Sequence, residues 1–425
     1  MQREITRASV LAAFAASVGM FVGATPMISA TASLFIKPLA AEFDLSRTAI
    51  SAILLMSPWT VALLAPFGGR ALDRWGVRKV ILPVLAIFAA CHFLLYFTNS
   101  IWQVIFFYVV LGACASVHTY SAYTKVIAMW FTRNRGLALG LMIASGSALG
   151  GALIPQLVRP WIDEYGWRAA YAGMGLIITF WGGPILFLFL REPAGVIQKK
   201  GDAPLAPLQG LARAEAFKTR TFWTIFALIL LSPMAIIGTA GHSFPMLTER
   251  GFNAVTATTA LSFIYIGGMI GQLSSGFLLD RINSPKIVIP YFACAMAGVV
   301  IMHTTSNPAF LIPGAMLLGL GQGSELGITA YLTTRYFGLK AYGAIYGILY
   351  GVASFGVGIG LMSMGIIHDI ADGYGPMKFV FIGAMSLVIL LVLTLPRYVY
   401  KRQSDPETGE SVALSSKAAP ANADS

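Results

Sequence analysis

Residues 69–79 of this chain read GRALDRWGVRK and directly follow a long stretch of apolar residues. A weaker copy, GFLLDRINSPK, fills residues 276–286 and again follows an apolar stretch. The aspartates at corresponding positions of the two copies, Asp73 and Asp280, are 207 residues apart. This spacing indicates that one structural unit occurs twice in the chain.

Two other pairs of landmarks recur at nearly the same offset. Trp130-Phe131 and Tyr336-Phe337 are 206 residues apart, and Tyr165-Gly166 and Tyr374-Gly375 are 209 residues apart. Transporters are often built from duplicated halves. Three matches at one offset therefore predict two homologous halves.

The composition points to a membrane protein. Of the 425 residues, 57% are apolar and only 11% are charged, whereas soluble domains carry about 25% charged residues. Such a chain fits neither a disordered segment nor a nucleic-acid-binding domain. The three cysteines, Cys91, Cys114 and Cys294, lie in apolar stretches without metal-ligand spacing. We therefore expect no metal, no cofactor and no nucleic-acid partner.

A membrane helix needs about 20 mostly apolar residues, and twelve stretches of the chain meet this requirement. They are residues 8–31, 47–68, 79–98, 101–124, 136–158, 168–190, 221–244, 256–279, 286–304, 308–332, 342–367 and 377–396. The predicted fold is an all-α membrane protein with twelve transmembrane helices in two pseudo-symmetric six-helix bundles. We expect the bundles at 1–190 and 221–396, a cytoplasmic linker at 191–220 and a disordered cytoplasmic tail at 397–425.

The basic residues indicate how the chain is oriented. If the N-terminus is cytoplasmic, 23 of the 29 Lys and Arg residues lie on the inner side and six on the outer side. Inner loops of membrane proteins are enriched in these residues. This bias accounts for the net charge of +11 without an acidic partner. It predicts cytoplasmic termini and a multi-pass protein of a bacterial-type inner (plasma) membrane.

The sequence at 69–79 resembles the signature of the major facilitator superfamily. The resemblance implies two bundles that rock about a central cavity, which opens alternately to each side of the membrane. Separately from the resemblance, the chemistry of this segment suggests a conformational latch, in which an aspartate at a helix end accepts charge-assisted hydrogen bonds in one conformation only. The candidate latch residues are Gly69, Asp73, Arg74, Arg78, Asp280 and Arg281. A merely orienting basic loop is the alternative.

Two further segments, residues 35–47 and 130–140, are similar to the monocarboxylate and oxalate–formate carrier branch, and residues 166–168 match a pattern that is shared more widely. This similarity implies an organic-anion carrier, often a proton symporter. Carriers of that branch commonly have an arginine in the eighth span where this chain has Gln272. A small carboxylate held by a buried arginine is therefore disfavoured, and a larger aromatic acid or a neutral solute is favoured.

Glu325 is the one acidic residue well inside a predicted span. A carboxylate is costly at membrane depth, so we expect this group to bind a proton. A carboxyl group that takes up a proton with the substrate and releases it inside would couple uptake to the proton gradient. A structural carboxyl group paired with a neighbouring helix is the alternative.

Polar residues in the predicted spans are candidates for substrate contact. They are His118, Tyr120, Gln272, Tyr346 and Tyr350. A histidine can hydrogen-bond a carboxylate or relay a proton, and tyrosines can stack on an aromatic acid and bind it through their hydroxyl groups. Ordinary core packing is the alternative for each of these residues.

These observations predict a secondary active transporter that takes up an organic monocarboxylate or an aromatic acid with protons, and not an enzyme. Its expected partners are the organic acid, protons and the lipid bilayer, and we expect a monomer. The first rival is a proton-driven exporter of hydrophobic compounds. Residues 145–155 lack the Gly-Pro-x-x-Gly-Gly element of drug antiporters, which weakens this reading. The second rival, a membrane sensor, is disfavoured because no appended module is evident.

Overall fold

The computed structural model describes residues 5–118, 120–131, 135–193, 210–282, 284–338 and 340–399. Within these ranges the backbone is helical apart from short connections and one isolated bridge between Gly210 and Gly338. Most of the predicted linker, 194–209, and most of the predicted tail, 400–425, lie outside the described residues.

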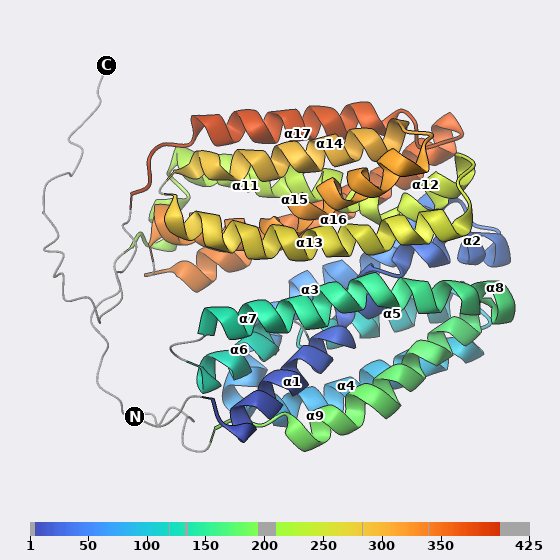
Figure 1. The fold of residues 1–425 in the computed structure, drawn as a ribbon, viewed down its shortest axis with the longest axis horizontal. Coiled ribbons are helices and arrows are strands. Elements are labelled where there is room, and N and C mark those ends of the chain that lie inside the picture. Colours follow the sequence, from blue (N-terminus) through green and yellow to red (C-terminus); the bar gives the residue numbers. More distant parts are fainter. Residues whose placement is uncertain are drawn as a thin grey trace, which may run out of the picture.

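The first half of the chain forms one helical bundle (Figure 1). Its helices are α1 (Arg7–Phe21), η1 (Thr25–Ser29), α2 (Ala32–Phe43), α3 (Arg47–Trp75), α4 (Val77–Leu94), η2 (Leu95–Phe97), α5 (Ile101–Ala115), α6 (Tyr120–Trp130), α7 (Arg135–Ile143), η3 (Ala144–Ala148), α8 (Leu149–Ile177), η4 (Ile178–Gly182) and α9 (Gly183–Phe189). Its apolar core draws almost entirely on residues from Ala12 to Leu190.

The second half forms the other bundle. Its helices are α10 (Arg213–Ala216), α11 (Arg220–Gly241), α12 (Ser243–Glu249), α13 (Ala254–Arg281), η5 (Pro285–Val288), α14 (Ile289–Thr304), α15 (Pro308–Phe337), α16 (Tyr342–Ala371) and α17 (Met377–Thr394). A separate apolar core runs from Ala216 to Leu395. The two bundles lie side by side, with α3 and α8 facing α16 and α13 (Figure 1). The duplication seen in the sequence thus corresponds to two independently packed bundles.

The molecule has two ends, and each is identified by the helices that lie there. The proximal end is where α1 begins at Arg7 and α17 ends at Thr394; the distal end is the opposite one, where α2 and α12 lie (Figure 1).

The helices of the structure cover most residues of the twelve predicted spans. Nine stretches of the described residues are long and apolar enough to cross a membrane, and one of them, Ala138–Phe189, contains two predicted spans. These two spans separate at Gly166, which has a φ of +83°. The predicted span 101–124 is divided into α5 and α6, and α15 is 30 residues long and carries Glu325 in its middle.

The segment at 69–79 is almost entirely helical and does not form an extended loop between two spans. Residues 69–75 form the last turns of α3, and α4 begins at Val77. The connection is Gly76 alone, with a φ of +85°, a conformation that favours glycine. The Glu192 carboxylate accepts a hydrogen bond from the backbone nitrogen of Val77 at 2.8 Å. A rigid helix-to-helix corner therefore presents the basic residues of this segment at the proximal end.

Candidate functional site

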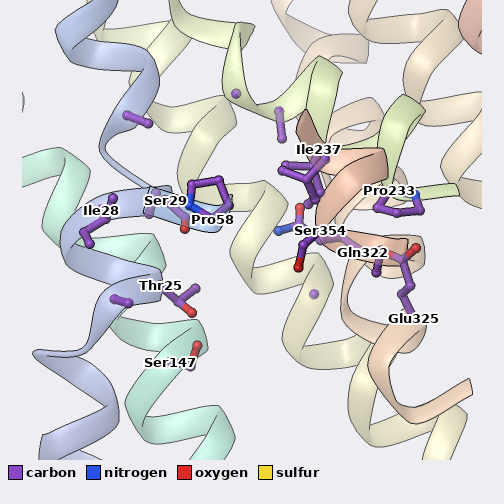
Figure 2. Close-up of a pocket in the computed structure, with 18 of the residues that line it drawn as sticks. Thr25, Ile28, Ser29, Pro58, Ser147, Pro233, Ile237, Gln322, Glu325 and Ser354 are labelled. Carbon is purple, nitrogen blue, oxygen red and sulfur yellow. The ribbon is translucent and has the colours of Figure 1, made fainter. Parts of the chain in front are cut away.

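A cavity of about 360 Å³ lies between the two bundles and is lined by residues of both. Figure 2 shows Thr25, Ile28, Ser29 and Ser147 on the side of the first bundle; Ile237, Gln322, Glu325 and Ser354 face them from the second. The cavity therefore lies where the rocking of two bundles would expose it to either side in turn.

On the side of the first bundle, two π-helical turns border the cavity. The first, η1, carries Thr25 and Ser29, and the second, η3, carries Ser147. A π-turn changes the direction of side chains relative to a regular helix and is frequent at functional sites. Gly146 of η3 packs so closely on α1 that an added Cβ would meet the Ser17 carbonyl oxygen at 2.6 Å. Close packing of small residues thus brings these hydroxyl groups to the cavity wall.

On the side of the second bundle, the central group is Glu325 of α15. Its side chain lines the cavity although the residue is only 8% exposed. The Ser232 hydroxyl of α11 donates a hydrogen bond of 2.5 Å to its carboxylate. Among the described residues that line the cavity, Glu325 is the only acid, and none is Lys, Arg or His. The described lining therefore combines one carboxyl group with neutral polar and apolar side chains.

Tyr120 and Gln272 connect the two bundles at the cavity. The Gln272 side-chain amide on α13 donates a hydrogen bond to the Tyr120 hydroxyl on α6, and both residues line the cavity. Tyr350 lines it as well and stacks on Tyr346 with 6.4 Å between ring centroids. Tyr346 stacks in turn on Tyr342 at 5.5 Å and is not among the lining residues. Three of the five predicted substrate contacts thus meet at one cavity.

His118 lies elsewhere in this structure. It is fully buried in the first bundle, with a Tyr123 hydroxyl 2.6 Å from its Nδ1 and the Val22 carbonyl oxygen 3.4 Å from its Nε2. These contacts hold the connection between α5 and α6 against α1. Its predicted contact with the substrate stays a prediction.

At the distal end, polar contacts join the bundles. Arg47 of α3 lies 3.1 Å from the Glu249 carboxylate of α12, and His368 of α16 lies 3.2 Å from the same carboxylate. The Lys37 ammonium group donates to the Thr248 hydroxyl at 2.7 Å. Together, Lys37, Arg47, Glu249, His368 and Asp369 form what we call the distal cluster. In this conformation the cluster holds the two bundles together on that side of the cavity.

The predicted latch is only partly visible, because the side chains of Asp73 and Asp280 lie outside the described part of the structure. Arg78 donates to the Phe187 carbonyl oxygen at 2.6 Å, and Arg281 lies 4.0 Å from the centre of the Phe277 ring. Arg74 lies 5.7 Å from the Trp75 ring, and an added Cβ on Gly69 would meet nothing within 4 Å. The latch therefore remains a prediction.

Sequence reasoning missed several polar residues of the cavity. They are Thr25, Ser29, Ser57, Ser147, Tyr265, Gln322 and Ser354. Serine and threonine are common in membrane helices because their hydroxyl groups can bond to the helix's own backbone, so they carry no signal by themselves. Gln322 had one available signal, since it lies one turn before Glu325 on the same helix face.

Comparison with known proteins agrees with this architecture. Residues 9–337 match the sequence profile of the Major Facilitator Superfamily. A gallate transporter of Pseudomonas putida is 24% identical over 77% of this chain and 82% of its own length. Human monocarboxylate transporter 11 is 24% identical over 88% of this chain and 81% of its own length.

Among solved structures, a bacterial homolog of the human lysosomal transporter Spinster, in an inward-facing and occupied conformation, has the same fold. It superimposes with a TM-score of 0.63 at 15% identity and covers 92% of this chain and 95% of its own. The chain thus belongs to the major facilitator superfamily and is a multi-pass membrane transporter that works by alternating access, not an enzyme.

Proposed function

We propose that this transporter takes up an organic monocarboxylate or an aromatic acid together with a proton. The observation that carries the proposal is the position of Glu325, a nearly buried carboxyl group on the wall of the central cavity. Ser232 orients it with a hydrogen bond. We further propose that the protein is a monomer in a bacterial-type plasma membrane. The distribution of basic residues supports cytoplasmic termini.

The charge of the cavity supports coupling to protons. Two negative charges repel each other strongly in a low-dielectric space. Because the described cavity lining contains no cation to offset this repulsion, an anionic substrate binds well only when Glu325 is protonated. By linkage, substrate binding raises the proton affinity of Glu325 by the same factor. Proton and anion therefore enter the cavity together, which is the requirement for symport.

The polar groups of the cavity support an aromatic or amphipathic acid. Tyr120, Tyr265 and Tyr350 offer ring faces and hydroxyl groups, and Gln272 and Gln322 offer amide groups. Such groups can stack on an aromatic ring and hydrogen-bond a carboxylate or a phenol. Two of the relatives carry the names gallate transporter and monocarboxylate transporter, which is consistent with this substrate class.

Uptake into proteoliposomes under an imposed pH gradient tests the proposal. Radiolabelled aromatic, aliphatic and neutral solutes are compared, and we expect an aromatic acid to accumulate when the substrate side is acidic. In Glu325→Gln, accumulation driven by the gradient is lost while exchange of internal for external substrate continues. Glu164→Gln, a change at an exposed acid of α8, is the matched control. Unchanged accumulation in Glu325→Gln would remove this residue from the coupling step.

Export of hydrophobic compounds is the second candidate, because many of the lining residues are apolar, among them Ile28, Leu54, Ile237 and Leu261. The same vesicles separate the two functions. A symporter accumulates substrate when the outside is acidic, whereas a proton-driven exporter accumulates it when the vesicle interior is acidic.

A further inference from the structure

A second hollow lies far from the central cavity, on the face of the first bundle that points away from its partner. It is an apolar groove of about 470 Å³ between α4 and the η4–α9 segment, which run next to each other at the outer edge of that bundle (Figure 1). Ten residues line the groove: Leu82, Leu85, Ala86, Ala89, Ala90, Phe93, Ile178, Thr179, Gly183 and Phe187. Since Phe93 is 43% and Phe187 60% exposed, the groove is open to the surrounding lipid.

The groove has a closed distal end. An added Cβ on Gly175 would meet the Phe93 nitrogen at 3.1 Å and the Ala89 carbonyl oxygen at 3.2 Å, so the helices touch there. Beyond this contact the π-turn at Ile178–Gly182 offsets the second helix, and alanines on α4 leave space between the two. The groove therefore lies on the proximal side of this contact.

The basic side chain of Arg78 lies at the proximal mouth of the groove. The Arg78 guanidinium spans the mouth, donating to the Phe187 carbonyl oxygen at 2.6 Å and lying 5.6 Å from the Phe187 ring centre. Lys79 and Arg74 are exposed close by in the chain. The nearby acid whose side chain is described, Glu192, already accepts a hydrogen bond from Val77. Among the described side chains, Arg78 at the mouth and Lys79 next to it in the chain therefore provide positive charge at this end of the groove.

The length of the groove matches one leaflet of a bilayer. Residues Leu82 to Phe93 rise by about 16 Å along α4, and half of the hydrocarbon core is about 15 Å thick. An acyl chain that fills the groove thus reaches from the headgroup region to the middle of the bilayer. Basic clusters at the ends of such grooves attract anionic headgroups.

We propose that this groove binds one anionic phospholipid of the proximal leaflet, with an acyl chain between α4 and α9 and the phosphate at Arg78 and Lys79. The inference is independent of the transported substrate and of proton coupling. It assigns a role to basic residues of the 69–79 signature segment and its helix corner beyond that of the latch.

The test is lipid retention by the full-length protein in detergent micelles containing equal amounts of phosphatidylglycerol and phosphatidylcholine. Bound lipid is counted by mass spectrometry, and the melting temperature is measured with each lipid alone. We expect the wild type to retain about one phosphatidylglycerol in preference to phosphatidylcholine and to melt higher with phosphatidylglycerol. Lys79→Gln weakens the preference about fivefold, as expected for the loss of one interfacial charge.

Substitutions that fill the groove with a large side chain distinguish lipid bound in the groove from lipid that adheres elsewhere on the protein. Ala90→Trp and Ala86→Phe place a large side chain at exposed positions of the groove, and we expect both to abolish retention. Leu390→Trp, at an exposed position of α17, is the matched control and retains the lipid. The proposal is overturned if wild type shows no headgroup preference, or if a monodisperse groove variant retains as much phosphatidylglycerol as the control.

Discussion

The Asp369 carboxylate of α16 caps the N-terminus of α3 across the boundary between the two bundles, with its Oδ2 2.9 Å from the Thr48 backbone nitrogen. Its other oxygen accepts from the Arg47 backbone nitrogen at 3.1 Å. A negative charge at a helix N-terminus is stabilised by unpaired N–H groups and by the helix dipole. The contact joins residues 321 positions apart. It exists only while the bundles are closed at the distal end, so it favours that conformation.

Removing the charge of Asp369 should loosen the distal end. In Asp369→Asn the interaction with the helix dipole is lost, at a cost of about 0.3–1 kcal/mol. A cysteine placed at Ser57 of the cavity should then react with a membrane-impermeant thiol reagent from the distal side about two- to fivefold faster. The matched control is Asp163→Asn, which removes a 2.7 Å ion pair with Arg159 inside one bundle. Equal labelling rates in both variants would contradict a closing role for Asp369.

The hydrogen bond between Gln272 and Tyr120 should act as one unit in transport. It joins the bundles, so it has to break when they separate at that level of the cavity. Tyr120→Phe and Gln272→Leu each remove it and should change the initial uptake rate in the same direction. The double variant should change the rate little further, with a coupling energy of about 0.5–1.5 kcal/mol. Initial rates measured in a double-mutant cycle provide the check, and additive effects would mean that the residues act separately.

Asp73 is proposed as the centre of the latch. We expect Asp73→Asn to slow turnover while leaving substrate affinity nearly unchanged, because a latch stabilises one conformation without touching the substrate. Turnover comes from exchange kinetics in proteoliposomes and affinity from equilibrium binding in detergent. A tenfold loss of affinity with normal turnover is the outcome that rules the latch out.

The Glu42 carboxylate at the end of α2 connects this helix to α8 at the distal end of the first bundle. It accepts from the Trp167 indole nitrogen at 2.8 Å and pairs with Arg168 at 2.6 Å. These hydrogen bonds, from Trp167 and then Arg168, lower the pKa of Glu42 below its ordinary value. Its stabilising contribution is therefore present above the ordinary pKa of about 4.3 and is lost as the pH falls through the lowered value.

Glu42→Gln should therefore melt about 1–2 °C lower than wild type at pH 7, since a partly exposed pair contributes little. The difference should begin to shrink as the pH falls below the ordinary pKa of about 4.3 and should vanish below the lowered pKa of Glu42. Asp44→Asn, at the neighbouring exposed cap of α2, serves as control and should show no such convergence. Thermal unfolding of the purified protein at several pH values measures both, and a difference that persists in acid would exclude the carboxylate as its source.

Several features could be predicted from the sequence because their causes are local. An apolar stretch of about 20 residues suffices to indicate a span, and the offset of 207 residues between Asp73 and Asp280 indicates the duplication. Glu325 stands out because an acid is costly inside such a stretch. That Gly76 alone connects α3 to α4 was not evident, since the predicted spans ended at residue 68 and began again at residue 79.

Other features could not be predicted, because they depend on how distant segments meet. In the sequence, Thr25, Ser29 and Ser147 look like ordinary packing residues. Only the π-turns η1 and η3 of the structure direct their side chains to the cavity. His118 and Tyr120 are two residues apart in the chain. One is buried in the first bundle, while the other reaches Gln272 of the second.

The sequence by itself determined that this protein is a duplicated, helical membrane transporter with one acid in its apolar interior. Hydrophobic length and charge bias are properties of single segments, so they can be read without a fold. Only the tertiary structure decided which polar groups share a cavity, that Asp369 caps α3 from the opposite bundle, and that a groove with a basic mouth faces the lipid. Each of these depends on contacts between helices, which the order of residues along one helix does not specify.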